Sequence, residues 1–481
     1  MPIATRREFC GISTKMRLWK RTDVSGVSNH MLIAIRFKNF LSFKGEAELS
    51  LVAHAADKTL SSSLINVAVS KRKKIDLLPV IAIYGANSAG KTNVLRTITY
   101  MKDAVVNSQS KWKPRGNTKF QTFADQNPFK DSGSIEIDFF ISDIRYTYGL
   151  SATRTHFVEE WLRSYPLGRE RELFSRAMHV PPEYDEFQDS GEVRAEAQFN
   201  FSDNFPGDKS YLETIVKKVR HNSLFLSAAA QDNHPLCREI YNWFDEIEVE
   251  NISSARDRTN AMVAAGRMAE DSGTKDAILR IMRAADPNLS DIIVRKTEFN
   301  SDVPSFVEEL GEENKRRFLE DFKYSVYFVT KNGDGTITLP FEAQSRGFQK
   351  LFALSSRVID ALKSGTSMFI DELETSIHPH LARFIVDLFQ NKEVNTGRSQ
   401  LIFTTHDTNM LDQSLLRRDQ IWFVERKGCC SELYSLLEFS PRKDENLERG
   451  YLRGRYGAIP ALGMDADWLE AGHQEATEGM R

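Results

Sequence analysis

The sequence of 481 residues predicts an α/β fold, in which a mixed sheet wraps around a phosphate-binding loop and a helical lobe is inserted in the chain. Three observations support this prediction. A glycine-rich loop follows an apolar strand near residue 85, and a second apolar strand ends in two carboxylates near residue 371. The segment between these two halves is more charged and shows helical periodicity.

The composition limits the class of protein. A chain of this length is expected to form roughly two or three lobes. Its 64 basic and 67 acidic residues give a formal charge of −3, so the surface as a whole is not a nucleic-acid-binding field. The four cysteines show neither metal-ligand spacing nor a secreted disulfide pattern, and no apolar stretch is long enough for a membrane helix. We therefore expect a cytoplasmic protein with no membrane segment.

We divide the chain into four segments. Residues 1–30 lack periodicity and are expected to form a disordered N-terminal extension, with Met31 as a candidate natural start. Residues 31–155 form a first lobe with the phosphate loop, and 156–335 form a mostly helical insert. Residues 336–481 complete the fold and end in a charged tail.

The first lobe is predicted to be rich in strands. Alternating or continuous apolar residues predict strands over 31–40, 47–52, 78–83, 134–141 and 144–150, and one helix over 93–106. Such a succession fits a sheet that wraps around one helix better than a regular alternation of strands and helices.

The insert and the last segment give different signals. In the insert, Ile278, Ile281, Met282 and Ala285 recur at helical spacing until Pro287 ends the run. The last segment alternates between strands and helices, with strands predicted over 336–341, 367–370 and 400–405 and helices over 347–363 and 380–389. This alternation favours parallel strands in a buried sheet.

A complete phosphate-binding loop joins the strand at 78–83 to the helix at 93–106. Its residues are Gly85, Ala86, Asn87, Ser88, Ala89, Gly90, Lys91 and Thr92, and Asn93 follows at the start of the helix. Glycines allow a close backbone approach, and the N–H groups at a helix N-terminus attract the charges of a triphosphate. Lys91 would reach the β- and γ-phosphates, and the Thr92 hydroxyl would bind Mg²⁺. The spacing therefore predicts nucleotide binding.

The strand predicted at 367–370 ends in two carboxylates, Asp371 and Glu372. Asp371 would hold Mg²⁺ directly or through water, whereas Glu372 points differently and would orient or deprotonate the attacking water. An apolar strand that ends in an acidic turn is weak evidence alone. Together with the phosphate loop, it becomes strong evidence for an ATPase site.

Three further features accompany these motifs. His406 follows the strand predicted at 400–405 and is placed to reach a γ-phosphate. Ser345 and Gly347 lie at a strand-to-helix junction, where a hydroxyl, a backbone N–H and a helix N-terminus would form a second anion site. An ordinary helix cap explains that segment equally well. Ser376 lies in the polar loop that follows the two carboxylates.

The order of these motifs resembles the ABC-type ATPase head shared by SMC proteins, OLD-family proteins and a group of prokaryotic AAA-type ATPases used in phage defence. Within this set, residues 39–43, 371–379 and 451–460 are similar to the RloA/AbiL-like defence ATPases, to which AriA of the PARIS system is related. The motifs cover both ends of the chain, and the middle matches by position only. The resemblance leaves the glutamine loop unplaced, with Gln121 and Gln126 as candidates.

The resemblance implies that two copies bind ATP and Mg²⁺ in a shared interface. Ser345, Gly347 and Ser376 of one copy would close over the γ-phosphate held by the other, in a head-to-head homo-oligomer. Glu372 and His406 would be the catalytic residues of slow ATP hydrolysis. The implied role is a sensor or scaffold in phage defence, which responds to a phage-protein trigger and controls a separate effector such as a nuclease or toxin.

Two other functions are left open. One is a DNA-acting ATPase of repair or chromosome organisation, which would use the basic runs at 71–74 and 315–317, although such runs are more often solvated turns. The other is a nucleotide-regulated structural protein with negligible turnover. A nuclease domain of the Toprim type is not expected, because the short tail offers only Asp465 and Asp467 of the carboxylates that such a domain needs.

Overall fold

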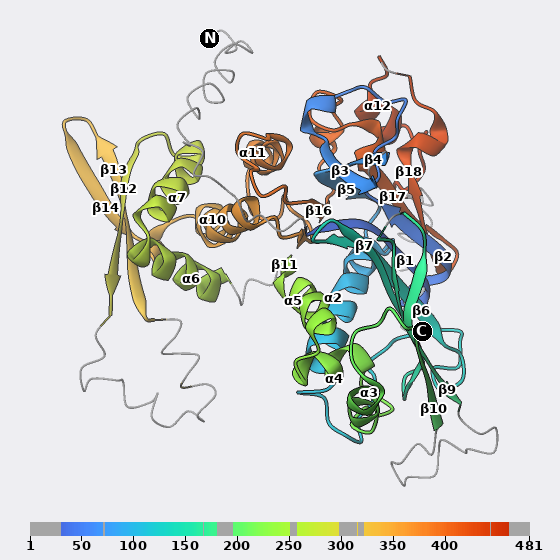
Figure 1. Ribbon diagram of the computed structural model, residues 1–481. Helices are drawn as coiled ribbons and strands as arrows, with labels where there is room; N and C mark the ends of the chain where they lie inside the picture. The colour runs from blue at the N-terminus through green and yellow to red at the C-terminus, as the bar shows by residue number, and fades with distance from the viewer. Residues whose placement is uncertain are drawn as a thin grey trace, which may run out of the picture.

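The computed structural model of the protein describes residues 30–70, 73–166, 168–179, 196–250, 257–297, 315, 322–442 and 444–460. Strands that are far apart in the sequence meet in a central sheet, and a second, larger sheet lies beside it (Figure 1). A smaller lobe with its own sheet lies on the other side of helix α10 (Arg346–Ser364) (Figure 1). The predicted extension at 1–30 lies outside the described residues except for His30.

The central sheet carries the phosphate loop. Among the described residues its order is β11 (Glu248–Glu250), β15 (Met368–Ile370), β16 (Leu401–Thr404), β5 (Val80–Tyr84), β17 (Ile421–Lys427) and β18 (Cys430–Ser435). Neighbouring strands are parallel from β11 to β17, and β18 is antiparallel to β17. Because parallel strands end at the same edge, the loops that follow β5, β15 and β16 meet there.

The strand β5 is buried on both faces, as parallel strands in a covered sheet are. Val80, Ala82 and Tyr84 point into one hydrophobic core, whereas Ile81 and Ile83 point into the other. The first core includes α10 and α11 (Pro379–Gln390), and the second includes α2 (Lys91–Asn107). The phosphate loop therefore begins from a strand that is fixed from both sides.

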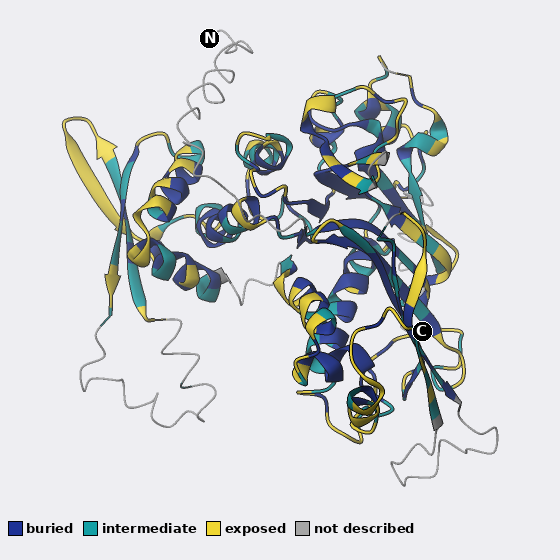
Figure 2. Ribbon diagram, viewed as in Figure 1, coloured by how far each residue is buried: buried dark blue, intermediate teal, exposed yellow. Residues whose placement is uncertain are grey.

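The larger sheet is antiparallel and extends beside α2 (Figure 1). Its order among the described residues is β10 (Glu196–Phe201), β9 (Arg171–His179), β8 (Phe157–Ser164), β7 (Ile144–Ala152), β6 (Gly133–Ile141), β1 (Met31–Phe40) and β2 (Phe43–Ser50). Its apolar side chains share a core with α2 and with α3 (Lys209–Val216), α4 (Phe225–Gln231) and α5 (Pro235–Glu246). The buried side of the sheet faces these helices (Figure 2).

The smaller lobe combines a three-stranded sheet with two helices. Its elements are α6 (Asp257–Glu270), α7 (Ser272–Ala285), β12 (Leu289–Lys296), β13 (Tyr324–Asn332) and β14 (Gly335–Pro340). Both helices pack against α10, and their apolar side chains join the core on that side of the central sheet. The helix expected at 275–285 is thus the C-terminal part of α7, and its apolar stripe is a packing face.

The segment 156–335 is less helical than the sequence indicated. It contains α3 to α7, but β8 to β10 extend the larger sheet, β11 joins the central sheet, and β12 and β13 belong to the smaller lobe. The strands were missed because charged residues on their outer face obscure the alternation. In β8, for example, Arg163 forms ion pairs with Glu136 and Glu170 across the sheet. The boundaries at 155 and 335 stay predictions.

The C-terminal motif at 451–460 packs behind the phosphate-loop strand. It begins in helix α12 (Leu447–Leu452), and the ring of Tyr451 lies 5.9 Å from that of Tyr84, the last residue of β5. The Tyr451 hydroxyl donates to the Ala458 carbonyl at 3.0 Å and closes the segment on itself. A separate hairpin, β3 (Ile65–Ser70) and β4 (Lys73–Leu77), packs on the outer side of β1.

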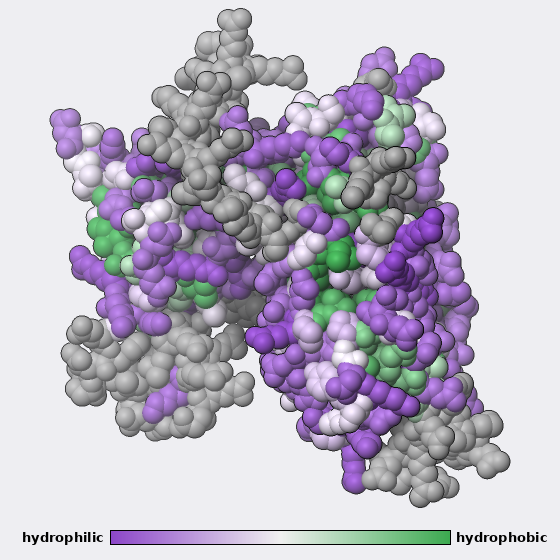
Figure 3. Space-filling model, viewed as in Figure 1, coloured by the Kyte–Doolittle hydropathy of each residue, from purple (hydrophilic) through white to green (hydrophobic). Residues whose placement is uncertain are grey.

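The remaining predicted elements are confirmed within a few residues. The expected strands at 336–341, 367–370 and 400–405 are β14, β15 and β16, and the expected helices at 347–363 and 380–389 are α10 and α11. The face shown in Figure 3 is largely hydrophilic, with apolar atoms gathered over the β12–β14 sheet and, in several groups, over the middle of the larger part of the molecule around β7 and α2. Among the described residues, no helix combines the length and the apolar character that crossing a membrane requires.

One buried side chain ties the two sheets together. Gln400, which is 1% exposed, precedes β16, and its Oε1 accepts the backbone N–H of Leu32 in β1 at 2.7 Å. Its Nε2 donates to the carbonyls of Leu32 at 3.0 Å and of Leu78 at 3.3 Å. These bonds fix the larger sheet against the start of the central one.

Replacing Gln400 with Ala should destabilise the protein by about 2 kcal/mol, because it leaves buried backbone groups of β1 without partners. Denaturant unfolding would measure the loss. Gln198→Ala, at an exposed position in β10, is the control and should cost little. An equal stability for the two variants would contradict the role assigned to Gln400.

Candidate functional site

The phosphate loop is held in a shape that only glycine permits at two positions. The loop follows β5, and α2 begins at Lys91 with Gly90 as its N-cap at φ 111°. A Cβ on Gly85 would lie 2.4 Å from the Val424 carbonyl oxygen, and one on Gly90 would lie 2.5 Å from the Ser431 Oγ. Close contacts with β17 and β18 therefore explain both glycines.

Two serines from distant parts of the chain support the loop. The Ser431 Oγ lies 2.6 Å from the Ala89 carbonyl oxygen and 2.8 Å from the Ser42 Oγ. Asn93 donates its side-chain N–H to the same Ser42 oxygen at 2.8 Å. Ser42 belongs to the motif at 39–43, which offered a signal in the sequence. Ser431 offered none, because only the fold brings it near.

Lys91 lies inside the site and is 6% exposed. Its ammonium donates to the carbonyls of Gly85 at 3.0 Å and Ala86 at 3.1 Å, and it lies 2.9 Å from the Nε2 of His406. Burial lowers the pKa of Lys91, and nearby carboxylates, with Glu372 first, oppose this shift. The ammonium thus lies inside the loop, facing the space where a phosphate would bind.

A chain of hydrogen bonds joins the phosphate loop to the two neighbouring strands. The Thr92 hydroxyl donates to Asp371 Oδ2 at 2.9 Å, and the Thr404 hydroxyl donates to Asp371 Oδ1 at 2.6 Å. A hydroxyl and a carboxylate are the hard oxygen ligands that Mg²⁺ takes in nucleotide sites. The structure therefore brings together the two residues predicted to bind the metal.

Glu372 begins a tight loop at the end of β15. Its φ of 49° lies in the left-handed region, which a residue other than glycine adopts at a cost of about 1 kcal/mol or more. Its N–H donates to the Thr404 hydroxyl at 2.7 Å, and its Oε2 accepts the Thr375 hydroxyl at 3.0 Å. Asp371 and Glu372 therefore have different hydrogen-bond partners, and the catalytic role of Glu372 stays a prediction.

His406 lies at the end of β16 beside Lys91. Burial lowers the pKa of the imidazole, and the Lys91 ammonium lowers it further, while Glu374 leads the carboxylates that oppose the shift. The geometry fits a neutral ring that accepts a hydrogen bond from Lys91 through Nε2. The loop after β16 is therefore in direct contact with the phosphate loop.

The predicted second anion site lies at the start of α10. Ser345 is the N-cap and accepts the Phe348 N–H at 3.3 Å, so the cap interpretation is correct at least for its geometry. Ser345 is exposed, and Ser376 is exposed at a φ of 67°. A Cβ on Gly347 would lie 2.3 Å from the Ser376 carbonyl oxygen. The structure thus groups these three residues with one another at the surface.

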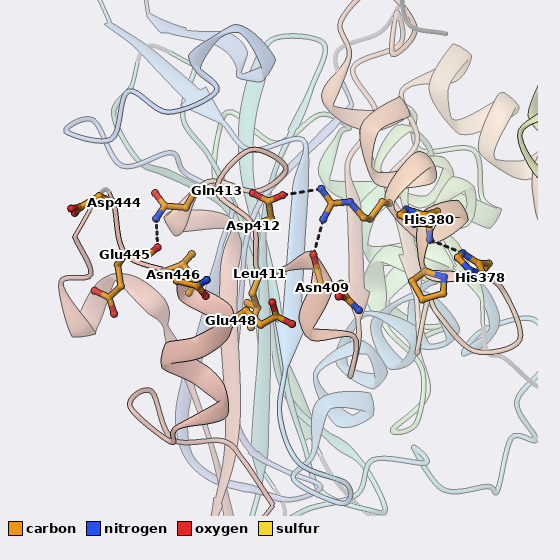
Figure 4. A pocket seen from close by; sticks show the side chains of 13 residues that line it. His378, His380, Asn409, Leu411, Asp412, Gln413, Asp444, Glu445, Asn446 and Glu448 are labelled. Atoms are coloured by element: carbon orange, nitrogen blue, oxygen red, sulfur yellow. Dashed lines mark hydrogen bonds and ion pairs between the residues drawn. The ribbon is translucent and has the colours of Figure 1, made fainter. Parts of the chain in front are cut away.

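A polar groove of about 650 Å³ opens beside the site (Figure 4). It lies between the start of α11, the loop that follows β16 and the segment before α12. Arg383 spans it, donating to the Asn409 carbonyl at 2.6 Å and to Asp412 Oδ2 at 2.9 Å. These bonds tie α11 to the loop that contains His406.

Several other predicted features are placed only in part. Gln121 lies beside the β1–β2 turn, since its carbonyl accepts the Leu41 N–H at 2.9 Å, and Gln126 donates to Asp125 at 2.7 Å. Their role as a glutamine loop stays a prediction. Residues 71–72 and 316–317 of the two basic runs, and the aspartates at 465 and 467, lie outside the described residues.

Comparison with known proteins agrees with this geometry. A family model described as "AAA domain, putative AbiEii toxin, Type IV TA system" matches residues 80–412, which is well over half of the chain. The chain belongs to this family. The match spans the phosphate loop, the Asp371–Glu372 pair and His406. A search of curated protein sequences gives no match.

The chain is also similar to solved structures at low identity. An SMC head bound to the C-winged helix domain of ScpA is 14% identical, with 84% of this chain and 97% of that chain covered and a TM-score of 0.36. The SMC head domain from Thermotoga maritima is 12% identical, with 84% of this chain and 98% of that chain covered and a TM-score of 0.36. The recombination mediator RecF is 10% identical, with 85% of this chain and 100% of that chain covered and a TM-score of 0.34. Such values carry no information on function.

The predicted fold class is confirmed. Membership of the AAA-domain family and the mixed sheets around the phosphate loop identify an ABC-type P-loop ATPase fold. The defence subgroup, the effector and the trigger are finer predictions, which the family match does not decide.

The pKa of His406 should lie below its ordinary value of 6.5. Because folding favours the neutral ring, the stability from the Lys91 contact should be fully present above pH 6.5 and be lost as the pH falls through the lower folded pKa. An NMR titration of the histidines would measure the pKa. The free energy of unfolding should be compared between the native chain and His406→Gln across this pH range. The difference removes the contribution of other histidines, such as His156, because burial lowers the pKa of His156 to about 4 in both proteins. A His406 pKa of 6.5 or higher would contradict this arrangement.

Proposed function

We propose that the protein binds ATP with Mg²⁺ and hydrolyses it slowly, and that two copies close around the nucleotide to control a separate effector in phage defence. One observation carries the ATPase part of this proposal. The Thr92 hydroxyl and the Asp371 carboxylate, 279 positions apart in the sequence, lie 2.9 Å from each other. Phosphate-loop ATPases hold the nucleotide-bound metal with this pair of groups.

The residues around the loop fit a metal–triphosphate rather than a bare triphosphate. Asp371, Glu372 and Glu374 all act on the pKa of Lys91, so three carboxylates lie near one cation. They would repel the phosphates unless a divalent cation offset their charge. Among the described residues, no group of three or more His, Cys, Asp or Glu side chains could hold a metal alone. Mg²⁺ would therefore take its other ligands from phosphate and water.

Each side chain then has a distinct task. Bound ATP and Mg²⁺ would supply the reacting phosphoryl group and the charge that polarises it. The Lys91 ammonium would compensate the charge on the outer phosphates, and Thr92 and Asp371 would hold the metal. Glu372 orients the attacking water and accepts its proton. His406, neutral and 2.9 Å from the Lys91 ammonium, would contact the terminal phosphate.

The exposed N-terminus of α10 supports a site shared by two copies. Ser345 and Ser376 are both exposed, and Gly347 lies against the backbone of Ser376. Together they present a hydroxyl, backbone N–H groups and the positive end of a 19-residue helix at the surface. A γ-phosphate held by a second copy would complete this anion site, so nucleotide binding would stabilise a head-to-head dimer.

Loss of the γ-phosphate would reverse this association. A charge-assisted hydrogen bond contributes roughly 1.5–3 kcal/mol, and two or three such bonds would cross the interface. Switching assemblies have states that differ by only a few kcal/mol. Slow hydrolysis of ATP would thus act as a timer for the assembly rather than as metabolism.

The family description fits a system of more than one component. It names a putative AbiEii toxin of a type IV toxin–antitoxin system, so it assigns the toxin to the family itself and implies a second protein that acts with it. Among the described residues the recognisable motifs are those of the nucleotide site, and we infer that a nucleolytic step would belong to the second protein. We infer that the assembled dimer holds or activates that partner when a phage protein appears.

Replacing Glu372 with Gln should lower kcat for ATP by about 100-fold or more, because the amide cannot accept the proton of the attacking water. ATP should still bind, so the variant should remain a nucleotide-bound dimer. Phosphate release and the mass of the chain with ATP would measure both effects. An unchanged kcat would show that Glu372 is not the catalytic carboxylate.

Replacing Ser345 with Arg should block the dimer but leave nucleotide binding intact, because the phosphate loop of each copy is untouched. With a non-hydrolysable ATP analogue, the native chain should double in mass and Ser345→Arg should not. Ser364→Arg, at an exposed serine at the other end of the same helix, is the matched control and should form the dimer.

Ser345→Thr keeps both the helix cap and the hydroxyl, so it should form the dimer and shows whether the position tolerates a substitution as such. A Ser345→Arg variant that doubles in mass like the native chain would exclude the shared site.

A further inference from the structure

A third carboxylate, Glu374, joins the loop after β15 to the loop after β16. Its Oε1 accepts the backbone N–H of His406 at 2.5 Å. One residue earlier, the Leu373 N–H donates to the Thr404 carbonyl at 3.1 Å, so the two loops are fastened at two successive points. The bond to Glu374 is the one that reaches His406 itself.

The other end of the same loop contacts the helix that carries the proposed second anion site. Lys350 of α10 donates from Nζ to the Thr375 carbonyl, and the Ser376 carbonyl lies against Gly347. Between these contacts and Glu374, the chain is held in a turn by the Ile377 N–H, which donates to the Glu374 carbonyl at 3.1 Å. Residues 371–377 therefore touch both halves of the proposed shared site.

The charge of Glu374 acts on the same place. Its carboxylate is among the groups that raise the pKa of Lys91 and of His406 against the lowering effect of burial. Its second oxygen, Oε2, is buried and has no hydrogen-bond partner among the described residues. Burying one oxygen of a carboxylate without a hydrogen bond costs free energy, and this cost points to a functional reason for the charge.

We propose that Glu374 is a positioning residue, which fixes His406 against Lys91 and links that arrangement to the start of α10. This proposal rests on the ATPase function proposed above. It assigns a role to a residue that lies two positions beyond the catalytic carboxylate and whose side chain reaches a different loop. When a second copy presses on Ser376, the movement is transmitted through Thr375 and Glu374 to His406.

The two glutamates of the loop therefore have separate tasks. Glu372 bonds within its own loop, to the Thr375 hydroxyl, and leaves its other oxygen for water. Glu374 bonds across to His406 through the backbone, so its effect passes through another residue. Loss of Glu372 removes the proton acceptor, whereas loss of Glu374 misplaces a group that is still present.

Replacing Glu374 with Ala and with Gln tests this assignment in the full-length chain. The Ala variant loses the bond and the charge, and kcat should fall about 10- to 100-fold with KM for ATP changed little, since a lost charge-assisted bond is worth roughly 1.5–3 kcal/mol. Gln offers an oxygen to the same N–H, so it should restore part of kcat. Glu393→Gln, at an exposed position after α11, is the matched control and should behave as the native chain.

An NMR titration of His406 gives a second measure that needs no nucleotide. Loss of the Glu374 charge should lower the His406 pKa further in both variants, because a carboxylate that favours the imidazolium is gone. A residue that only supported the fold would reduce thermal stability without this shift. The melting temperature of each variant therefore accompanies the titration.

The outcomes separate the two proposals. Where the native chain hydrolyses ATP and Glu374→Ala has the same kcat and the same His406 pKa, Glu374 has no positioning role and the ATPase function stands. Where the native chain neither binds nor hydrolyses ATP, the proposed function fails, and the His406 titration alone still decides whether Glu374 positions the imidazole.

Discussion

The parallel register of β15, β16 and β5 is the constraint on which the site depends. Ile370 pairs with Phe403, which pairs with Ala82, so the next residues in each strand, Asp371, Thr404 and Ile83, lie in one row. This row explains why Thr404 lies 2.6 Å from Asp371 and why Thr92, the last residue of the phosphate loop, reaches the same carboxylate. A slip of one residue in β16 would turn Thr404 to the opposite face and break the chain.

The register is itself fixed by burial on both faces of the sheet. Each of the three strands sends alternate side chains into two separate cores. A slip of one residue would therefore move the side chains of that strand from each core into the other. Apolar packing thus sets the positions of the polar groups at the strand ends. The strands are fixed by this packing, so changes of charge at the site would move the loops at the strand ends rather than the strands.

The sequence predicted those parts of the site whose signals are local. The phosphate loop needs Gly85 and Gly90 because β17 and β18 lie against them, and the spacing of the two glycines is visible in the sequence. Helix α10 was predicted well because Ser345 caps its start and Gly365 ends it at a φ of 86°. Each of these features is written within a few neighbouring residues.

Features that depend on contacts between distant segments could not be predicted from one sequence. Ser431 contacts the phosphate loop at the Ala89 carbonyl and also contacts Ser42, which lies 389 positions away, and no local pattern marks Ser431. The strand β11 has only three residues, two of them Glu, and it is a strand because β15 pairs with it. Contact with the rest of the fold overrides local propensity in such short elements.

The loop at 371–377 would couple the two halves of the proposed shared site. It leaves β15 at Asp371, contacts His406 part-way along, and ends against Gly347 at the start of α10. Lys91 meets His406 from the opposite side at 2.9 Å, so the position of the imidazole depends on groups from both halves. Any force on the exposed Ser376 is applied to a turn that already holds Glu372 in the left-handed region. A turn with a residue in the left-handed region has few ways to relax, and this is why we propose that a change at Ser376 would reach His406.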